Sequence, residues 1–148
     1  MEQLLRDFVS HKTIGLIGLS RQKNKFGNYA YKELTSRGYS VYPIHPSEKE
    51  VDGILCYPSL AAIKEKVNVV VVSVSGRKII QILNEVSSAG IKNIWLQQGC
   101  ESSEIIEEAN RLGLSIVTKK CILMYAEPVR SIHKFHRMVS NIFNRKNG

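Results

Sequence analysis

The chain has 148 residues, of which 43% are hydrophobic and 23% are charged, a composition typical of a globular domain and unlike that of a disordered chain. This length suffices for about one domain whose core needs no disulfide or metal. The formal net charge of +8 predicts attraction to a polyanion, so nucleic acid, anionic lipid and phosphorylated small molecules are the classes of partner to consider.

The apolar runs and the cysteines bear on where the protein resides. The longest apolar run, around residues 69–72, is far shorter than the ~20 residues of a membrane-spanning helix, so we expect no transmembrane segment. Cys56, Cys100 and Cys121 are odd in number and lack the spacing of metal-binding pairs. Reduced thiols are typical of the cytoplasm, and we therefore expect a cytoplasmic protein.

In chain order, the first segment is MEQLLRDFVSHK, for which we expect a helix over residues 1–12 rather than a signal peptide. After it, short β-branched runs alternate with segments of helical period, as in βαβ units. The expected strands cover residues 13–18, 40–44, 68–74, 92–96 and 115–118, and the expected helices cover residues 28–37, 60–66, 76–89 and 103–112. Gly38, Gly90 and Gly113 are the expected helix stops, and Ser59 and Ser75 the expected N-caps.

Two segments indicate how these elements pack. VNVVVVSVS is apolar on both faces, as expected for a central strand that helices cover on each side. GRKIIQILNEVSSAG has one apolar helix face that would pack on the sheet. The sequence therefore predicts an α/β domain over residues 1–127, with a doubly wound, mostly parallel five-stranded sheet and flanking helices.

Residues 128–148, PVRSIHKFHRMVSNIFNRKNG, predict an added C-terminal amphipathic helix that is basic. Apolar residues recur there at three- and four-residue steps, and the other faces carry Arg, Lys and His. Three roles are open for this helix: packing on its own domain, contact with a second copy or a partner protein, and contact with an anionic membrane surface.

The loop GLSRQKNKFGN follows the first predicted strand, where a doubly wound sheet binds its ligands. Gly18 has no Cβ and would let the backbone approach a ligand, and Ser20 can donate a hydrogen bond. Arg21, Lys23 and Lys25 add positive charge, and the following helix would direct its N-terminus at an anion. The loop is typical of a phosphate site; the alternative is a plain strand-to-helix turn with solvated lysines.

The fingerprint of dinucleotide sites, G-x-G-x-x-G, is absent because Gly15 and Gly18 are too far apart and the next glycine is Gly27. The second predicted strand ends in VYPIHP, without the carboxylate that binds the ribose of NAD. His45, next to Pro46, suits a phosphorylated ribose; the alternative for His45 is a turn residue.

From residue 13 to about residue 125 the chain resembles the small single-domain CoA-binding proteins, whose Rossmann-like fold is similar to the N-terminal domain of the succinyl-CoA ligase α subunit. The matching segments are GLS with KFGN, VYPIHP, DGILCYPSL, VVVVSV, IWLQQGCESSEI and KKCILM. In that family the loop after the first strand holds the CoA pyrophosphate, the end of the second strand lies near the adenosine, and the end of the third strand borders the nucleotide. Relatives often have asparagine at the position of His45 and proline at that of Ser75.

The resemblance implies a coenzyme A or acyl-CoA ligand. The residues to which it assigns binding are Gly18, Leu19, Ser20, Lys25, Gly27, Asn28, His45, Pro46, Ser73, Val74 and Ser75. From their positions we add Arg21 and Arg77 as phosphate partners, and Gln98 and Gly99 at the end of the fourth strand. The alternative for Arg77 is an exposed cation in the first turn of a helix, where positive charge opposes the helix dipole. Cys100 either reacts with a ligand thiol as a mixed disulfide or is a small buried residue.

No catalytic constellation is found in the sequence, and the only arrangement that suggests a metal, His133 and His136 with Cys121, lacks a second ligand pair. The family's larger members carry a phosphorylated histidine in a separate domain, and we expect no counterpart of that domain among these 148 residues. We therefore expect non-catalytic binding of CoA or an acyl-CoA, in a regulatory or carrier role. One alternative is a basic interaction protein, for a partner protein or nucleic acid, with a vestigial nucleotide pocket; the other is a subunit of a split acyl-CoA ligase. Of these partners we do not expect nucleic acid, because no helix-turn-helix or aromatic stacking strip is found.

Overall fold

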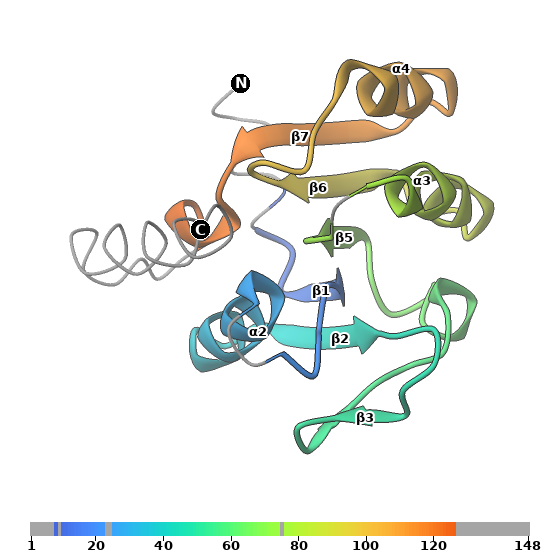
Figure 1. The fold of residues 1–148 in the computed structure, drawn as a ribbon. Helices are drawn as coiled ribbons and strands as arrows, with labels where there is room; N and C mark the ends of the chain where they lie inside the picture. Colours follow the sequence, from blue (N-terminus) through green and yellow to red (C-terminus); the bar gives the residue numbers. More distant parts are fainter. Residues whose placement is uncertain (1–7, 9, 23–24, 75, 127–148) are drawn as a thin grey trace.

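The computed structural model describes residues 8, 10–22, 25–74 and 76–126. Its centre is a parallel five-stranded sheet with the order β2-β1-β5-β6-β7 (Figure 1). The strands are β1 (Thr13–Ile17), β2 (Ser40–Ile44), β5 (Val69–Val72), β6 (Asn93–Gln97) and β7 (Ser115–Lys120). All five lie within about two residues of the predicted ranges, which confirms the α/β fold class.

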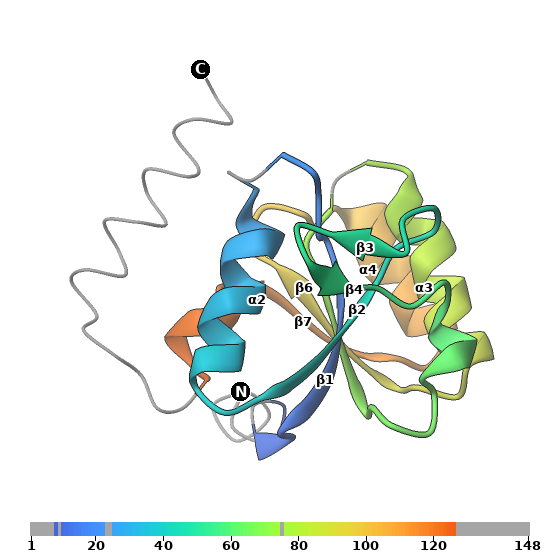
Figure 2. The ribbon, with the colours of Figure 1, turned by 90° about the horizontal axis from the view of Figure 1, so that it is seen from below.

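Helices cover both faces of the sheet, as a doubly wound fold requires. Helix α2 (Phe26–Ser36) lies on one face, and α3 (Lys78–Ser88) and α4 (Ser103–Arg111) lie on the other (Figure 2). Because successive side chains of a strand point to opposite faces, Val71 packs in the cluster that contains Phe26, and Val70 in the cluster that contains Leu83. All four residues of β5 are buried, as its valine run predicts.

The helix ends agree in part with the sequence signals. Gly38, Gly90 and Gly113 have φ values of 93°, 78° and 72°, which confirms them as left-handed stops after the helices. Helix α3 begins at Lys78 with Arg77 at the N-cap position, two residues later than predicted. The predicted N-cap Ser75 lies outside the described residues, and Ser59 makes no side-chain capping bond.

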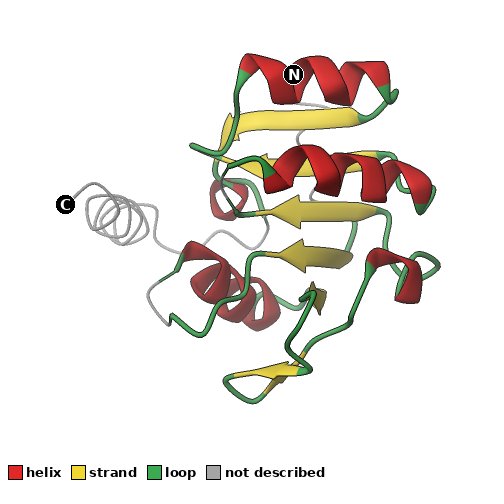
Figure 3. Ribbon diagram, turned by 45° about the vertical axis from the view of Figure 1, so that its right-hand side comes forward, coloured by secondary structure: helices red, strands yellow, loops and turns green. Residues whose placement is uncertain are grey.

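Two predictions between β2 and β5 were wrong or incomplete. The helix predicted over residues 60–66 is a 3-10 turn, η1 (Leu60–Ala62), followed by further i to i−3 bonds, because so short a segment gains little from helical propagation. A hairpin of β3 (Glu50–Val51) and β4 (Ile54–Leu55) was not predicted. It lies beside β2 (Figure 3) and turns through Asp52 and Gly53, whose φ values of 54° and 82° fit a type I′ turn.

The described chain ends against α2. After β7 comes η2 (Ile122–Met124), and the buried guanidinium of Arg37 donates to the carbonyl oxygens of Leu123 and Ala126, both at 2.8 Å. The same guanidinium pairs with Glu33 at 3.0 Å. These bonds hold the last described residues of the chain against the end of α2. The C-terminal helix predicted over residues 128–148 lies outside the described residues.

At the other end of the chain, Phe8 and Ser10 are helical, and the rest of the helix predicted over residues 1–12 is either not described or not helical. Phe8 is buried and meets Trp95 edge to face at 6.1 Å between ring centroids. Among the described residues, no helix is both long enough and apolar enough to span a bilayer.

Candidate functional site

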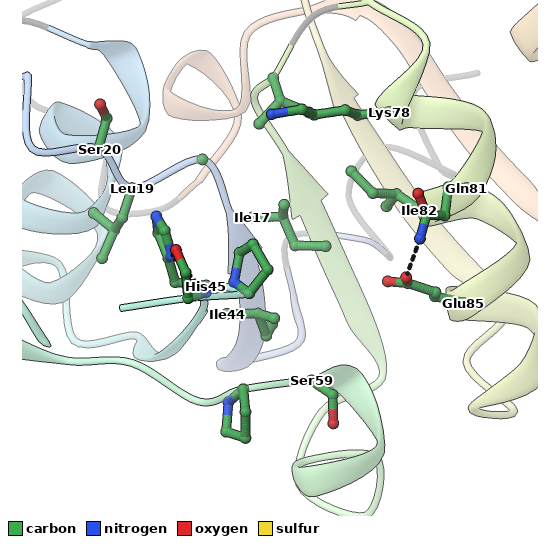
Figure 4. Close-up of a pocket in the computed structure, with 15 residues that line it drawn as sticks. Ile17, Leu19, Ser20, Ile44, His45, Ser59, Lys78, Gln81, Ile82 and Glu85 are labelled. Atoms are coloured by element: carbon green, nitrogen blue, oxygen red, sulfur yellow. Dashed lines mark hydrogen bonds between the residues drawn. The ribbon is translucent and has the colours of Figure 1, made fainter. Parts of the chain in front are cut away.

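A pocket of about 590 Å³ opens at the carboxyl ends of β1, β2 and β5 (Figure 4). Strand β1 lies between β2 and β5, so the crossovers that follow β1 and β2 lead to opposite sides of β1. This reversal is where doubly wound sheets bind ligands. The lining residues are Ile17, Gly18, Leu19, Ser20, Ile44, His45, Pro46, Ser47, Pro58, Ser59, Val74, Lys78, Gln81, Ile82 and Glu85.

The loop after β1 depends on two glycines. Gly18 has a φ of 152°, and a Cβ there would lie 2.7 Å from the carbonyl oxygen of Ser73. A Cβ on Gly27 would lie 2.1 Å from the carbonyl oxygen of Gly18. The sequence-based reason for Gly18, close approach to a ligand, is therefore incomplete, because the protein's own backbone already occupies the space of a side chain.

Asn28, at the start of α2, holds this loop in place. Its side chain is 4% exposed; Oδ1 accepts from the N–H of Ser20 at 2.9 Å, and Nδ2 donates to the carbonyl oxygen of Ser20 at 2.7 Å. The Ser20 hydroxyl accepts from the N–H of Gln22 at 3.1 Å and keeps its own proton for a ligand. Asn28 does not line the pocket, but it holds the backbone of Ser20, which does.

Leu19 joins the loop to the β3–β4 hairpin. It is 4% exposed and packs with Val51 and Cys56 in a small cluster separate from the two main cores. Burial raises the pKa of the Cys56 thiol. The hairpin, which was not predicted from the sequence, therefore packs behind Leu19 on one side of the pocket, and Leu19 contributes apolar surface to the pocket.

His45 turns the loop after β2. Its Nδ1 accepts from the N–H groups of Glu48, at 3.0 Å, and Ser47, at 3.2 Å. Because Nδ1 accepts, the proton of the neutral ring is on Nε2, which leaves one donor on the far side of the ring. The structure thus shows His45 in a turn, the alternative considered for it, and also places it in the lining of the pocket. A contact between His45 and a phosphorylated ribose stays a prediction.

The loops after β1 and β2 are joined by an ion pair. Arg21 donates through Nη2 to Oε2 of Glu48 at 2.7 Å, and the side chains are 76% and 27% exposed. The segment VYPIHP contains no carboxylate, but the loop after β2 does contain one, because Glu48 follows that segment by two residues. Arg21, predicted as a phosphate partner, is partly neutralised by this carboxylate.

Helix α3 forms the side of the pocket that faces these two loops. Lys78, Gln81, Ile82 and Glu85 line it, and Gln81 donates to Glu85 at 3.3 Å. Figure 4 shows Lys78 extending from α3 over the ends of the strands. We did not predict this edge of α3 from the sequence. The four residues recur at steps of three and four positions, which places them on one face of a helix, and this spacing could have indicated them.

A second cavity, of about 730 Å³, lies between the first turns of α3 and α4. Two residues predicted to bind the ligand line it, Arg77 and Gly99, together with Gly76, Ile80, Cys100, Glu101, Ser102, Glu104 and Ile105. Lys78, the residue after Arg77, is the cation that α3 contributes to the first pocket. Arg77 and Gly99 therefore line a different cavity from the predicted residues that follow β1, β2 and β5.

The fifteen predicted binding residues are therefore only partly brought together. Six line the pocket at the reversal: Gly18, Leu19, Ser20, His45, Pro46 and Val74. Five of the others, Arg21, Lys25, Gly27, Asn28 and Ser73, line neither cavity but belong to or pack on the loops around the first pocket. Gln98 is exposed and lines neither cavity, and Ser75 lies outside the described residues.

Metal binding has no support in the described part of the chain, which contains no group of three or more His, Cys, Asp or Glu residues suited to hold an ion. His133 and His136 lie outside it. Cys121 is buried, and burial raises the pKa of its thiol while the neighbouring Gln97 amide opposes that rise.

The sequence is similar to part of several larger proteins. It is 28% identical over 137 residues to the ADP-forming acetate–CoA ligase I of Archaeoglobus fulgidus, a match that covers 86% of this chain and 20% of that protein. It is also 28% identical to the α subunit of the ADP-forming acetate–CoA ligase II of Pyrococcus furiosus, over 80% of this chain and 28% of that subunit. The chain thus spans a fifth to just over a quarter of these relatives.

The fold is also found in a solved structure of similar length. A hypothetical protein from Pyrococcus horikoshii OT3 is 30% identical and superposes with a TM-score of 0.75, covering 87% of this chain and 92% of that one. The family described as "CoA binding domain" matches residues 12–127. The family match covers most of the chain, and it agrees with the parallel sheet and with the resemblance in the strand-end segments, so this chain belongs to the CoA-binding domain family.

Proposed function

We propose that this protein binds coenzyme A or an acyl-CoA in the pocket at the ends of β1, β2 and β5, and that by itself it catalyses no reaction. The observation that carries the proposal is the coincidence of two features. The family match covers residues 12–127, and the pocket lies at the reversal of the sheet, lined by the glycine loop and by Lys78.

The chemistry of the pocket fits a nucleotide with phosphates. The Ser20 hydroxyl, Nε2 of His45 and the ammonium group of Lys78 are donors suited to phosphate oxygens. Ile17, Ile44 and Ile82 provide the apolar surface that an adenine ring would cover. The polar pair Gln81 and Glu85 can both donate to and accept from the polar groups of a base or a pantetheine arm.

The absence of a reaction is proposed from what lines the pocket. The pocket groups that could act as nucleophile, base or acid are Ser20, Ser47, Ser59, His45, Lys78 and Glu85. Among these groups in the described structure, the Ser47 hydroxyl contacts Nδ1 of His45 at 3.4 Å. That nitrogen already accepts from the backbone N–H groups of Ser47 and Glu48, so it is not free to act as the base of a nucleophile. Binding without chemistry would suit a protein that senses, carries or regulates through CoA.

A titration with a variant that fills the pocket tests the proposal. Ser59 is exposed and makes no capping bond, so Ser59→Trp should place a large ring in the pocket without disturbing the core. Calorimetry should show saturable binding of CoA by the native chain and a loss of affinity of at least tenfold in Ser59→Trp. Ser115→Trp, at the exposed start of β7, is the matched control and should bind as the native chain does. Equal affinity of all three proteins would place CoA elsewhere.

A second candidate is the CoA-binding subunit of a split acyl-CoA ligase. The observation that favours it is the naming of one relative as a ligase α subunit, of which this chain covers 28%. Ligase activity is assayed as acyl-CoA formation from CoA, an acid and a nucleoside triphosphate, with the chain alone and with a co-expressed ligase subunit. Activity that appears only in the mixture would establish the split enzyme, and activity of the chain alone would contradict the non-catalytic proposal.

A further inference from the structure

The ion pair of Arg21 and Glu48 lies directly beside the candidate pocket. Arg21 follows Ser20 and Glu48 follows Ser47, and both serines line the pocket. The two charged groups are 2.7 Å apart and join the loops after β1 and β2, although Arg21 and Glu48 are 27 positions apart in the chain. The backbone N–H of Glu48 also donates to His45, so the pair and the histidine belong to one bonded arrangement.

The carboxylate of Glu48 and the guanidinium of Arg21 would favour different forms of a nucleotide's ribose. In doubly wound folds a carboxylate at the end of the second strand accepts from free ribose hydroxyls, whereas an arginine near it accommodates a phosphate on the ribose. Here Glu48 lies four residues after the last residue of β2, and Arg21 pairs with it from the neighbouring loop. Both determinants are present, and each offsets the charge of the other.

We propose that the Arg21–Glu48 pair sets the preference of the site for a phosphorylated over an unphosphorylated ribose. The inference rests on the proposed function, because it assigns the ribose end of a CoA ligand to these loops. A phosphate on the ribose takes donors of Arg21 in place of the Glu48 carboxylate, and the guanidinium has enough donors to contact both. Glu48 repels the ribose phosphate and competes with it for the donors of Arg21. It therefore limits the preference of the site for a phosphorylated ribose.

Two substitutions are predicted to shift this preference in opposite directions. Arg21→Gln removes the phosphate donor and leaves Glu48 unpaired, so a ribose phosphate is repelled. Glu48→Gln removes the competing anion and frees Arg21. Because exposed ion pairs are weak, each substitution should change the ratio of the two affinities by about threefold to tenfold, and less at high salt.

The test is a parallel calorimetric titration with CoA and with dephospho-CoA, which lacks only the ribose 3′-phosphate. The quantity measured is the dissociation constant for dephospho-CoA divided by that for CoA. It should be lowest in Arg21→Gln, intermediate in the native chain and highest in Glu48→Gln. Arg111→Gln and Glu108→Gln remove the same charges from an exposed ion pair on α4 that lines neither cavity, and should leave the ratio unchanged.

The outcomes separate this inference from the proposed function. If the native chain binds neither ligand, both the proposed function and the inference are overturned. If CoA binds and the ratio is the same in every variant, CoA binding stands and the ion pair has no part in ribose selection. If Arg21→Gln weakens both ligands equally, Arg21 contacts the pyrophosphate they share, which also overturns the inference.

Discussion

At the scale of single residues, the shape of the site depends on residues that hold the loop after β1 in place as well as on the residues that line the pocket. Gly18 and Gly27 allow the loop backbone to lie against Ser73 and against the first turn of α2. Asn28 uses both ends of its amide on the backbone of Ser20. Both Gly27 and Asn28 were predicted to bind the ligand; in the structure Gly27 packs on the loop backbone and Asn28 hydrogen-bonds to it, and ligand contact by either residue stays a prediction.

The first prediction concerns Gly27, which has a helical backbone within α2. Alanine normally favours a helix over glycine, but the Cβ of Gly27→Ala would lie 2.1 Å from the carbonyl oxygen of Gly18. We expect a loss of about 1–3 kcal/mol in the free energy of unfolding, as for other overpacked sites. Thr35→Ala, exposed in the same helix, is the control and should be nearly neutral. A Gly27→Ala protein as stable as the native chain would contradict the packing.

The second prediction contrasts two adjacent cations. Lys78 lines the pocket proposed for CoA, whereas Arg77 lines the second cavity. Lys78→Gln should weaken CoA binding by about threefold to tenfold and reduce its dependence on salt, since one contact between a cation and a phosphate is lost. Arg77→Gln removes the same charge one residue away and should have little effect. Calorimetry at two salt concentrations measures both, and the reverse order would place the phosphates in the second cavity.

At the scale of elements, the β3–β4 hairpin is held to the domain by a small apolar cluster. Its strands have two residues each, and Val51 and Cys56 pack with Leu19 and with the partly buried Tyr31 of α2. Backbone hydrogen bonds of Tyr57 join the segment after the hairpin to β2 and its loop. Cys121, in contrast, belongs to one of the two large core clusters, the one that contains Trp95 and Phe26. We therefore expect the hairpin to open locally at a lower free energy than the core.

The third prediction uses the two buried thiols to compare these elements. Cys56 and Cys121 are 7% and 5% exposed, and burial raises the pKa of each thiol. Alkylation requires the thiolate, so labelling of both should be slow at neutral pH and rise as the pH rises. In a Cys100→Ser background, mass spectrometry should find Cys56 labelled before Cys121, and CoA should slow the labelling of Cys56. Equal labelling rates would mean that the hairpin opens only with the whole domain.

The same pKa shifts give a direction for stability. A thiol whose folded pKa is raised favours the neutral form in the native state. Its contribution is fully present below the pKa of the unfolded thiol and is lost as the pH rises towards the folded value. The thiols should therefore make the protein less stable at alkaline pH than at neutral pH.

At the scale of the whole molecule, the sequence was sufficient for the sheet and its winding. The alternation of β-branched runs and helical periods predicted five strands close to their observed bounds, because each period follows from burial on one or two faces. Asp52-Gly53 between Val51 and Ile54 is a strong hairpin signal that could have been used as well.

The composition of the site was less predictable, because it depends on the packing of elements. Arg77 and Lys78 are separated by about 100° around a helix axis, so the choice between them requires the orientation of α3 on the sheet. The Arg21–Glu48 pair joins residues 27 positions apart, and no local pattern indicates it. The loop residues after β1 and β2 were predictable because the carboxyl ends of adjacent parallel strands meet at one edge.

The most direct test of the account is hydrogen–deuterium exchange of the whole chain with and without CoA. We predict that CoA protects the backbone of residues 17–22, 44–48, 58–59 and 78–85, which surround the pocket at the ends of β1, β2 and β5. Exchange at the start of β7 and at the exposed end of α4 should be unchanged. Protection confined to the second cavity or to residues 127–148, or no protection with saturating CoA, would contradict the proposed site.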